Sequence, residues 1–439
     1  MEDAKSDAAI TRASKRVFFN MSVFEFLTFL RRGVFYTFMI NYLFILMGTV
    51  TSTAALGTFN AIASSLGQNL LWGRISDRLK LRTTLIIAGE TIAASAYIVV
   101  FFVHRIFINA GNNFYAGLTI IIGLSCLEFF WSMSDVGWAA LLTDITSYET
   151  RGKVIGAMNF IASLGRTAGI LFAGFLYNDG QGFMNGTIFY IVTILLFIGA
   201  ALMAITSRSV KTNLNVPRQP LENNYKIRPS GTGSTNRSYA SFLISLIVII
   251  LGAASINQIF LLFINLKDGL NATDPQMSLI LTAWAIGGMI ASLAAGRFAD
   301  QIGRTRVLLA GFTVAAITPL FYSLTSDVLS MALIYGLNGV SFWTIQTVGL
   351  VFAGDLIPKE KRGRFLGAYN AVMALSWGPA GILIGGPLAD IQVERLHLTP
   401  YAAYVNMFYV SSVIVAVGTF LFAVRFAIRK NRQILKLQD

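Results

Sequence analysis

The sequence is poor in the residues that most metal and enzyme sites require. It has one cysteine, Cys126, so it cannot form an intrachain disulfide, and two histidines, His104 and His397, which we expect in loops. Structural and catalytic metal sites are built from clusters of such residues, so we expect no metal and no cofactor. The sequence also lacks a G-x-x-x-x-G-K-[ST] phosphate-binding pattern and a Ser–His–acid set, so we expect no catalytic residues and no enzyme.

Charged residues are also scarce. They make up 13% of the 439 residues, whereas hydrophobic residues make up 55%, and the mean hydropathy is +0.65. A soluble domain needs more polar surface than this. The apolar residues come in blocks of about 20, the length of a helix that crosses a bilayer. Twelve such blocks predict an all-α membrane protein with twelve transmembrane helices, at residues 21–47, 55–73, 83–103, 114–141, 153–176, 187–206, 239–265, 277–296, 306–325, 328–352, 365–388 and 401–427.

The few charges are distributed unevenly. No short apolar core with a cleavage site follows the polar N-terminus, so we expect no signal peptide. Of the 34 Lys and Arg residues, 28 lie in the two tails, in the loops on their side of the membrane or at the span ends there, three lie in loops on the other side, and three lie within predicted spans away from their ends. This asymmetry predicts cytoplasmic termini in a multi-pass protein of the cell membrane, and it accounts for the net charge of +13 without nucleic acid as a partner.

A polar stretch and an internal repeat divide the chain into halves. Residues 208–238 are rich in Pro, Gly, Ser and Asn and separate six predicted spans from six. The segment 144–159 aligns without gaps to 355–370, with seven of 16 positions identical. We therefore expect two pseudo-symmetric six-helix bundles, with an N-tail, two bundles, a linker and a C-tail over residues 1–20, 21–207, 208–238, 239–427 and 428–439.

Two charged loops occupy equivalent places in the halves. "GRISDRLKLR" follows the second predicted span, and "GRFADQIGRTR" follows the eighth. The pattern G-x-x-x-D-R resembles the signature of the major facilitator superfamily, and so do the Arg-Gly pairs that open the fifth and eleventh spans. The resemblance implies a transporter fold and a cytoplasmic gate formed by Gly73, Asp77, Arg78, Arg151, Gly296, Asp300, Gly303, Arg304 and Arg362.

Elementary physical chemistry suggests how such a gate would work. Gly73 and Gly296 are expected where two helices approach closely, because glycine has no side chain to keep them apart. Asp77 and Asp300 are expected to accept hydrogen bonds from the N-terminus of a neighbouring helix, whose dipole favours an anion. The first loop departs from the family pattern, since Lys80 stands where a second Gly is usual and Leu81 where an Arg is usual.

Charges inside the predicted spans, away from their ends, are confined to the N-terminal half. A charge at the bilayer centre costs about 2.5–3.5 kcal/mol, so it usually has a function or a partner. Spacing places Glu25 with Arg32, and Glu128 with Asp135, on common helix faces, and the family resemblance implies that these helices line a central cavity. The candidate substrate and proton pathway in this half is Glu25, Arg32, Glu128, Asp135 and Arg166; the alternative is that these groups form structural ion pairs.

The C-terminal half offers amides in place of charges. Gln258, Asn338 and Gln346 complete the candidate pathway, although such amides also join helices to one another. Arg31 and Glu90 are weaker candidates, and Glu25 and Glu90 are placed near enough to the cytoplasmic side for water to reach them. The segment "WGPAGILIGG" at 377–386 resembles a signature of drug antiporters in this superfamily, but it lies in the eleventh span and not in the fifth.

These patterns predict a secondary active transporter of a small organic solute that works by alternating access, functions as a monomer and is coupled to protons. Two alternatives stay open. An apolar half opposite a polar half would suit export of amphipathic drugs or lipids, and the same fold could serve as a receptor or scaffold without transport.

Overall fold

The computed structural model describes residues 2–146, 148–213, 232–357 and 362–428, with side chains at 16–146, 154–207, 237–357, 367–376 and 378–428. All regular structure in these ranges is helical. Nine helical segments there are long and apolar enough to cross a membrane. They comprise α5 (Arg82–Asn109), α6 (Asn113–Ile145), α7 (Tyr148–Leu176), α9 (Thr187–Asn213), α10 (Thr232–Ala254) with α11 (Asn257–Asn265), α12 (Asp274–Ile302), α13 (Arg304–Tyr322), α14 (Val328–Asp355) and α17 (Pro400–Ala423) with the π turn that follows it.

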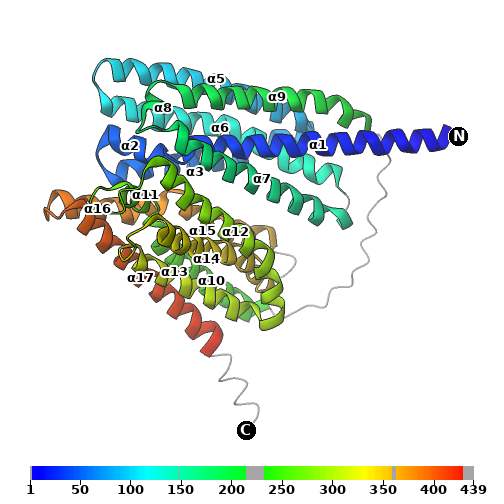
Figure 1. The fold of residues 1–439 in the computed structure, drawn as a ribbon. Coiled ribbons are helices and arrows are strands. Elements are labelled where there is room, and N and C mark those ends of the chain that lie inside the picture. The colour runs from blue at the N-terminus through cyan, green and yellow to red at the C-terminus, as the bar shows by residue number, and fades with distance from the viewer. Residues whose placement is uncertain (1, 147, 214–231, 358–361, 429–439) are drawn as a thin grey trace, which may run out of the picture. The chain divides into compact units, whose positions relative to one another are not determined.

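The other three predicted spans are interrupted helices. The first consists of α1 (Glu2–Tyr36) and α2 (Met39–Met47). The second is α3 (Val50–Leu66), which passes through a π turn at Gly67–Trp72 into the short α4 (Gly73–Leu79). The eleventh is α15 (Arg362–Ala374) and α16 (Gly386–Glu394), joined by a 3-10 turn and a π turn. The predicted all-α fold with twelve crossings is therefore confirmed (Figure 1).

The chain divides into two compact units, and the first contains residues 1–42 and 59–225. In this unit α1 packs on α7 and α9, and α5 packs on α6 and α9 (Figure 1). The contact of α1 with α7 is possible because both helices carry glycine there: a Cβ at Gly33 would lie 2.5 Å from the main-chain oxygen of Arg166, and one at Gly165 would lie 2.3 Å from that of Phe26. Small residues of this kind let membrane helices approach backbone to backbone.

The second unit contains residues 43–58 and 226–439 and uses the same device. Helix α12 packs on α14, where a Cβ at Gly287 or Gly339 would lie 2.2 Å from a main-chain oxygen of the other helix. Aromatic rings fill the core between α10, α13, α14 and α17, with Phe242, Phe312 and Phe422 fully buried. The domain boundaries expected from the sequence stay a prediction.

Residues 43–58 precede the main part of the first unit in sequence but pack within the second. The carboxylate of Asp390 on α16 accepts hydrogen bonds from the main-chain N–H groups of Val50 and Thr51, at 2.8 and 2.9 Å. The Thr51 hydroxyl donates a third hydrogen bond at 2.5 Å. Asp390 thus satisfies the free N–H groups that begin α3, as an N-cap residue does, from a distant part of the chain.

The expected place of one histidine was wrong. His104 lies in α5 and not in a loop, and its side chain is fully buried. Its ring is 2.7 Å from the Tyr42 hydroxyl oxygen through Nε2 and 3.1 Å from the Ala116 carbonyl oxygen through Nδ1. A carbonyl can only accept, so Nδ1 carries the proton and Nε2 accepts from the Tyr42 hydroxyl.

Candidate functional site

Charged side chains of the first unit meet between α1, α5 and α6. Arg32 on α1 and Asp135 on α6 form an ion pair of 3.4 Å, and it is the partly exposed portion of the cluster, with 26% and 38% of their side chains exposed. The sequence placed both residues in the candidate pathway, and the structure brings them together. Because the pair is not fully buried and its contact is long, a polar ligand could replace either partner.

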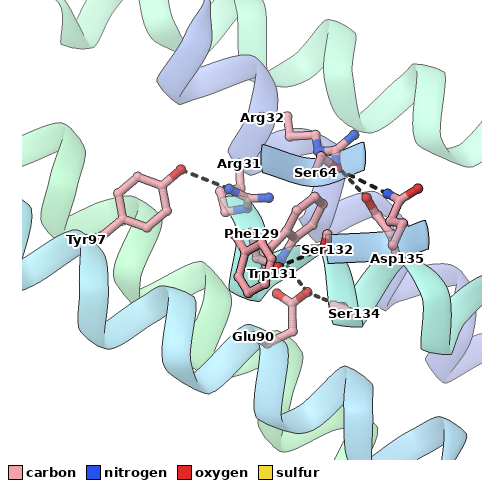
Figure 2. A network of polar contacts seen from close by, with 11 residues as sticks. Arg31, Arg32, Ser64, Glu90, Tyr97, Phe129, Trp131, Ser132, Ser134 and Asp135 are labelled. Atoms are coloured by element: carbon pink, nitrogen blue, oxygen red, sulfur yellow. Dashed lines mark hydrogen bonds and ion pairs between the residues drawn. The ribbon is translucent and has the colours of Figure 1, made fainter. Parts of the chain in front are cut away.

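Trp131 is the centre of the cluster. Its ring is buried, and the guanidinium carbons of Arg31 and Arg32 lie 4.6 and 4.2 Å from the ring centroid. These are cation–π distances. Consecutive residues of a helix point about 100° apart, yet both arginines reach this indole, beside which Figure 2 draws them. The ring is therefore in contact with both the partly exposed Arg32 and the buried Arg31.

A buried layer lies behind Trp131. Glu90 on α5 is 1% exposed, and its Oε1 accepts hydrogen bonds from Trp131 Nε1 at 2.8 Å and from the Ser134 hydroxyl at 2.7 Å (Figure 2). Arg31 is 2% exposed; it donates to the Tyr97 hydroxyl at 3.1 Å, and its Nε has no hydrogen-bond partner. Burying a cation that has an unpaired N–H donor costs free energy. Packing alone would favour apolar residues in this layer, so its charged residues are candidates for a function.

The remaining charged candidates of this unit lie around the network. Glu25 is 6% exposed, so the expectation that water reaches Glu25 and Glu90 was wrong: both acids are covered by neighbouring helices. Glu128 is half-buried on α6, and Arg166 is half-buried on α7. Among the described residues, no three His, Cys, Asp or Glu side chains converge as metal ligands.

The amides of the second unit are in different situations. Asn338 accepts a hydrogen bond from Trp284 Nε1 at 3.2 Å and donates one to the Thr318 hydroxyl at 3.3 Å, so it joins α12, α13 and α14. Gln258 is buried on α11, and its Oε1 has no hydrogen-bond partner. Gln346 lies half-buried on α14. Their place in a substrate pathway stays a prediction.

The loop before α5 contains an acid–arginine–acid cluster. Arg82 lies 3.5 Å from Asp77 and 3.2 Å from Asp144, and it also donates to the hydroxyl and carbonyl oxygens of Ser76. Arg78, which was predicted to take part in the gate, is exposed. In the part of the chain that the structure describes, Asp77 thus contacts an arginine and not the N-terminus of a neighbouring helix.

The second loop contains the equivalent cluster. Arg304 lies 3.9 Å from Asp300 and hydrogen-bonds to Asp355. The expected close approach of helices at Gly73 and Gly296 was wrong: a Cβ at Gly296 would meet no atom of the described residues within 4 Å, and one at Gly73 would meet the Gln68 carbonyl of the preceding turn. Gly303 has a positive φ of 95°. The side chains of Arg151 and Arg362 lie outside the described residues, and the gate itself stays a prediction.

Sequence reasoning missed most of the buried layer. Glu90 and Arg31 were recognised as intramembrane charges but left out of the pathway, and Tyr97 and Ser134 were not considered. Spacing groups Trp131 and Asp135 with Glu128 on one face of α6, but it carries no signal for Glu90 or Tyr97 on α5.

Comparisons with known proteins agree with this architecture. The model of the Major Facilitator Superfamily matches residues 21–267 and 242–435. Multidrug resistance protein 1 of Bacillus subtilis is 25% identical over 264 residues, which are 59% of this chain and 63% of that protein. An MFS-type transporter of Mycobacterium tuberculosis is 30% identical over 115 residues, 26% of this chain and only 17% of the relative.

Solved structures share the fold. A bacterial homologue of the iron transporter ferroportin in an inward-facing state superposes with a TM-score of 0.67 at 13% identity, over 94% of this chain and 99% of that one. The nucleoside transporter NupG has a TM-score of 0.62 at 18% identity, over 94% of this chain and 99% of that one. Because the family model covers nearly the whole sequence, this multi-pass membrane protein belongs to the Major Facilitator Superfamily.

Proposed function

We propose that the protein is a secondary active transporter of a small organic solute, that it works by alternating access, and that transport is coupled to protons. The observation that carries the proposal is the partly exposed Arg32–Asp135 pair above a buried layer of charges. A polar ligand could enter this partly exposed ion pair and bind to Arg32 or Asp135 in place of the other residue. Membership of the superfamily supports transport rather than catalysis.

The residues divide between two roles in this proposal. Arg32 and Asp135 contact the ionisable or hydroxylated part of the solute, with Arg166 and the amides Gln258, Asn338 and Gln346 as further contacts. Glu25 and Glu128 take part in proton transfer. The loops at Asp77 and Asp300 act at the cytoplasmic ends of the bundles. Both termini are cytoplasmic, the site of action is the cell membrane, and the working form is a monomer.

The first test identifies a ligand without assuming one. A thermal-shift screen of metabolites and drugs on the purified protein detects binding, because a ligand that binds only the folded form raises its apparent stability. A ligand found in this way is then followed in proteoliposomes under an imposed pH gradient. The substitutions Asp135→Asn and Glu128→Gln each remove a charge and are expected to reduce gradient-driven uptake at least tenfold. Asn185→Ala, which lies outside the site, is the control and is expected to leave uptake unchanged.

The outcomes separate the competing functions. Full gradient-driven uptake in both variants would rule out the proton role. A second candidate function is export of amphipathic drugs, favoured by the similarity to Multidrug resistance protein 1. It predicts drug hits in the screen and lower drug susceptibility of cells that express the protein. A receptor or scaffold predicts binding with no flux under any gradient.

A further inference from the structure

Glu90 is a buried acid that the proposed mechanism does not use. Its side chain is 1% exposed, and the ion pairs of the described residues do not include it. An ionised carboxylate that is buried without a cation partner costs several kcal/mol, on the order of the whole stability of a single domain. Glu90 therefore needs a way to be neutral, and a bound proton supplies it.

The hydrogen bonds to Glu90 suit a protonated acid. Both donors, the Trp131 indole and the Ser134 hydroxyl, are uncharged, and both end on the same oxygen, Oε1. This arrangement leaves Oε2 to carry the proton. On the other side, a Cβ at Gly199 of α9 would lie 3.8 Å from Oε2 and 3.4 Å from the Phe24 ring, so the oxygen lies in a confined, mostly apolar place.

The charged groups around Glu90 come from two helices. Arg31 and Glu25 on α1 and Asp135 on α6 are close enough to interact electrostatically with Glu90, and Arg31, the cation among them, forms no ion pair with it among the described residues. From α9 the neighbour is Gly199, which brings no charge. Arg31 is the cation among these neighbours, and its Nε has no hydrogen-bond partner.

We propose that Glu90 is a proton-binding site of this protein and that Trp131 transmits its protonation state to the Arg32–Asp135 pair. Loss of the proton strengthens the hydrogen bond from the Trp131 N–H, because a charged acceptor holds a donor more tightly than a neutral one. The same Trp131 ring contacts Arg32, whose guanidinium carbon lies 4.2 Å from the ring centroid. A change at Glu90 thus reaches the exposed pair through one rigid side chain. The link to transport rests on the proposed function; the proton site does not.

Tryptophan fluorescence tests the proton site without a substrate or a gradient. The 439-residue chain contains six tryptophans, and subtraction of the Trp131→Phe spectrum isolates the signal of Trp131. A pH titration of this signal is expected to show one transition in the natural protein. Glu90→Gln, which keeps an acceptor oxygen for Trp131, is expected to abolish the transition, whereas Asp135→Asn and Glu128→Gln are expected to retain it.

A milder pair of variants covers the case in which Glu90→Gln does not fold. Ser134→Ala removes one of the two donors to Oε1 and is expected to move the midpoint by about one pH unit, since a hydrogen bond to a charged group contributes a free energy of that order. Ser132→Ala is the matched control, because the Ser132 hydroxyl donates to the Phe129 carbonyl and not to Glu90. Its midpoint is expected to stay unchanged.

The proposal is overturned if the transition survives in Glu90→Gln, if it disappears in Asp135→Asn, or if the two serine variants behave alike. Its failure is distinguishable from that of the proposed function. Flux that depends on a pH gradient, together with a flat Trp131 titration, would keep the transporter and remove Glu90 from it. A titration that depends on Glu90 in a protein without flux would do the reverse.

Discussion

The loops before α5 and α13 build the same kind of ion-pair cluster with different residues. In each unit one arginine contacts an acid in its own loop and an acid at the end of a distant helix. The distant acids, Asp144 and Asp355, are the first aligned pair of the internal repeat. The arginines are not equivalent in sequence, because Arg82 comes one position later in its loop than Arg304 does in the other.

The backbone of the two loops differs at one aligned position. Lys80 adopts a left-handed conformation, with φ of 54°, where the second loop has Gly303 with φ of 95°. A φ above zero is costly for a non-glycine residue, whereas glycine adopts it freely. Both loops therefore place an arginine against an acid at the end of a distant helix. The position of that arginine in the loop differs by one residue.

The two clusters also differ in burial. The Arg82 side chain is 15% exposed and that of Arg304 is 32% exposed, and the distant acids follow the same order. Arg82 additionally donates to Ser76. Because ion pairs contribute more where water is excluded, the first cluster is expected to stabilise its unit more than the second.

The largest expected effect follows from this difference. Arg82→Ala removes the ion pairs to Asp77 and Asp144 and the hydrogen bond to the buried Ser76 hydroxyl, and it is expected to destabilise the protein by about 2–3 kcal/mol, the range for hydrogen bonds to charged groups. Arg304→Ala breaks a more exposed cluster and is expected to cost at most about 1 kcal/mol. Thermal unfolding of the purified variants measures both values. Equal losses would show that burial does not separate the clusters.

A second experiment examines the backbone of the C-terminal loop. Gly303→Ala introduces a Cβ at φ of 95° and ψ of 137°, a region that side chains avoid, and is expected to cost about 1–3 kcal/mol. Gly296→Ala is the control in the same segment, because its Cβ would meet nothing within 4 Å and its backbone is helical. Alanine there is expected to be neutral or to stabilise by up to about 1 kcal/mol. A loss of the same size at both positions would contradict the role assigned to φ.

The sequence sufficed for the crossings but not for their interruptions. A helix must be about 20 residues long to cross a bilayer, so apolar block length alone predicted twelve spans. A block length does not report the breaks after Tyr36 and Ala254, whereas the interruption after Ala374 contains Gly378 and Pro379, which favour one. His104 was misplaced for a related reason: its burial is made possible by a hydroxyl from a residue 62 positions away.

The candidate site was predicted in part. Spacing brought out Arg32 and Asp135, since residues on one helix face recur every three or four positions. Glu90, Tyr97 and Ser134 escaped because apolar residues surround a membrane helix on every side, so the pattern does not mark which face points inward. The rotation of α5 that turns Glu90 toward α6 is fixed by packing, for example by Gly89, where a Cβ would lie 2.9 Å from the Ser134 main chain.

The smallest expected effect concerns Lys80, where the two loops differ most directly. Lys80→Gly removes the cost of a left-handed lysine, about 1 kcal/mol, but it also gives the unfolded chain more freedom, which offsets about half of that gain. We expect a net stabilisation of about 0.5 kcal/mol in thermal unfolding, the difference between these two terms. Lys80→Ala keeps the Cβ and removes only the charged stem, so it is expected to give no gain. If alanine stabilised as much as glycine, repulsion from the neighbouring arginines, and not backbone conformation, would set the first loop apart from the second.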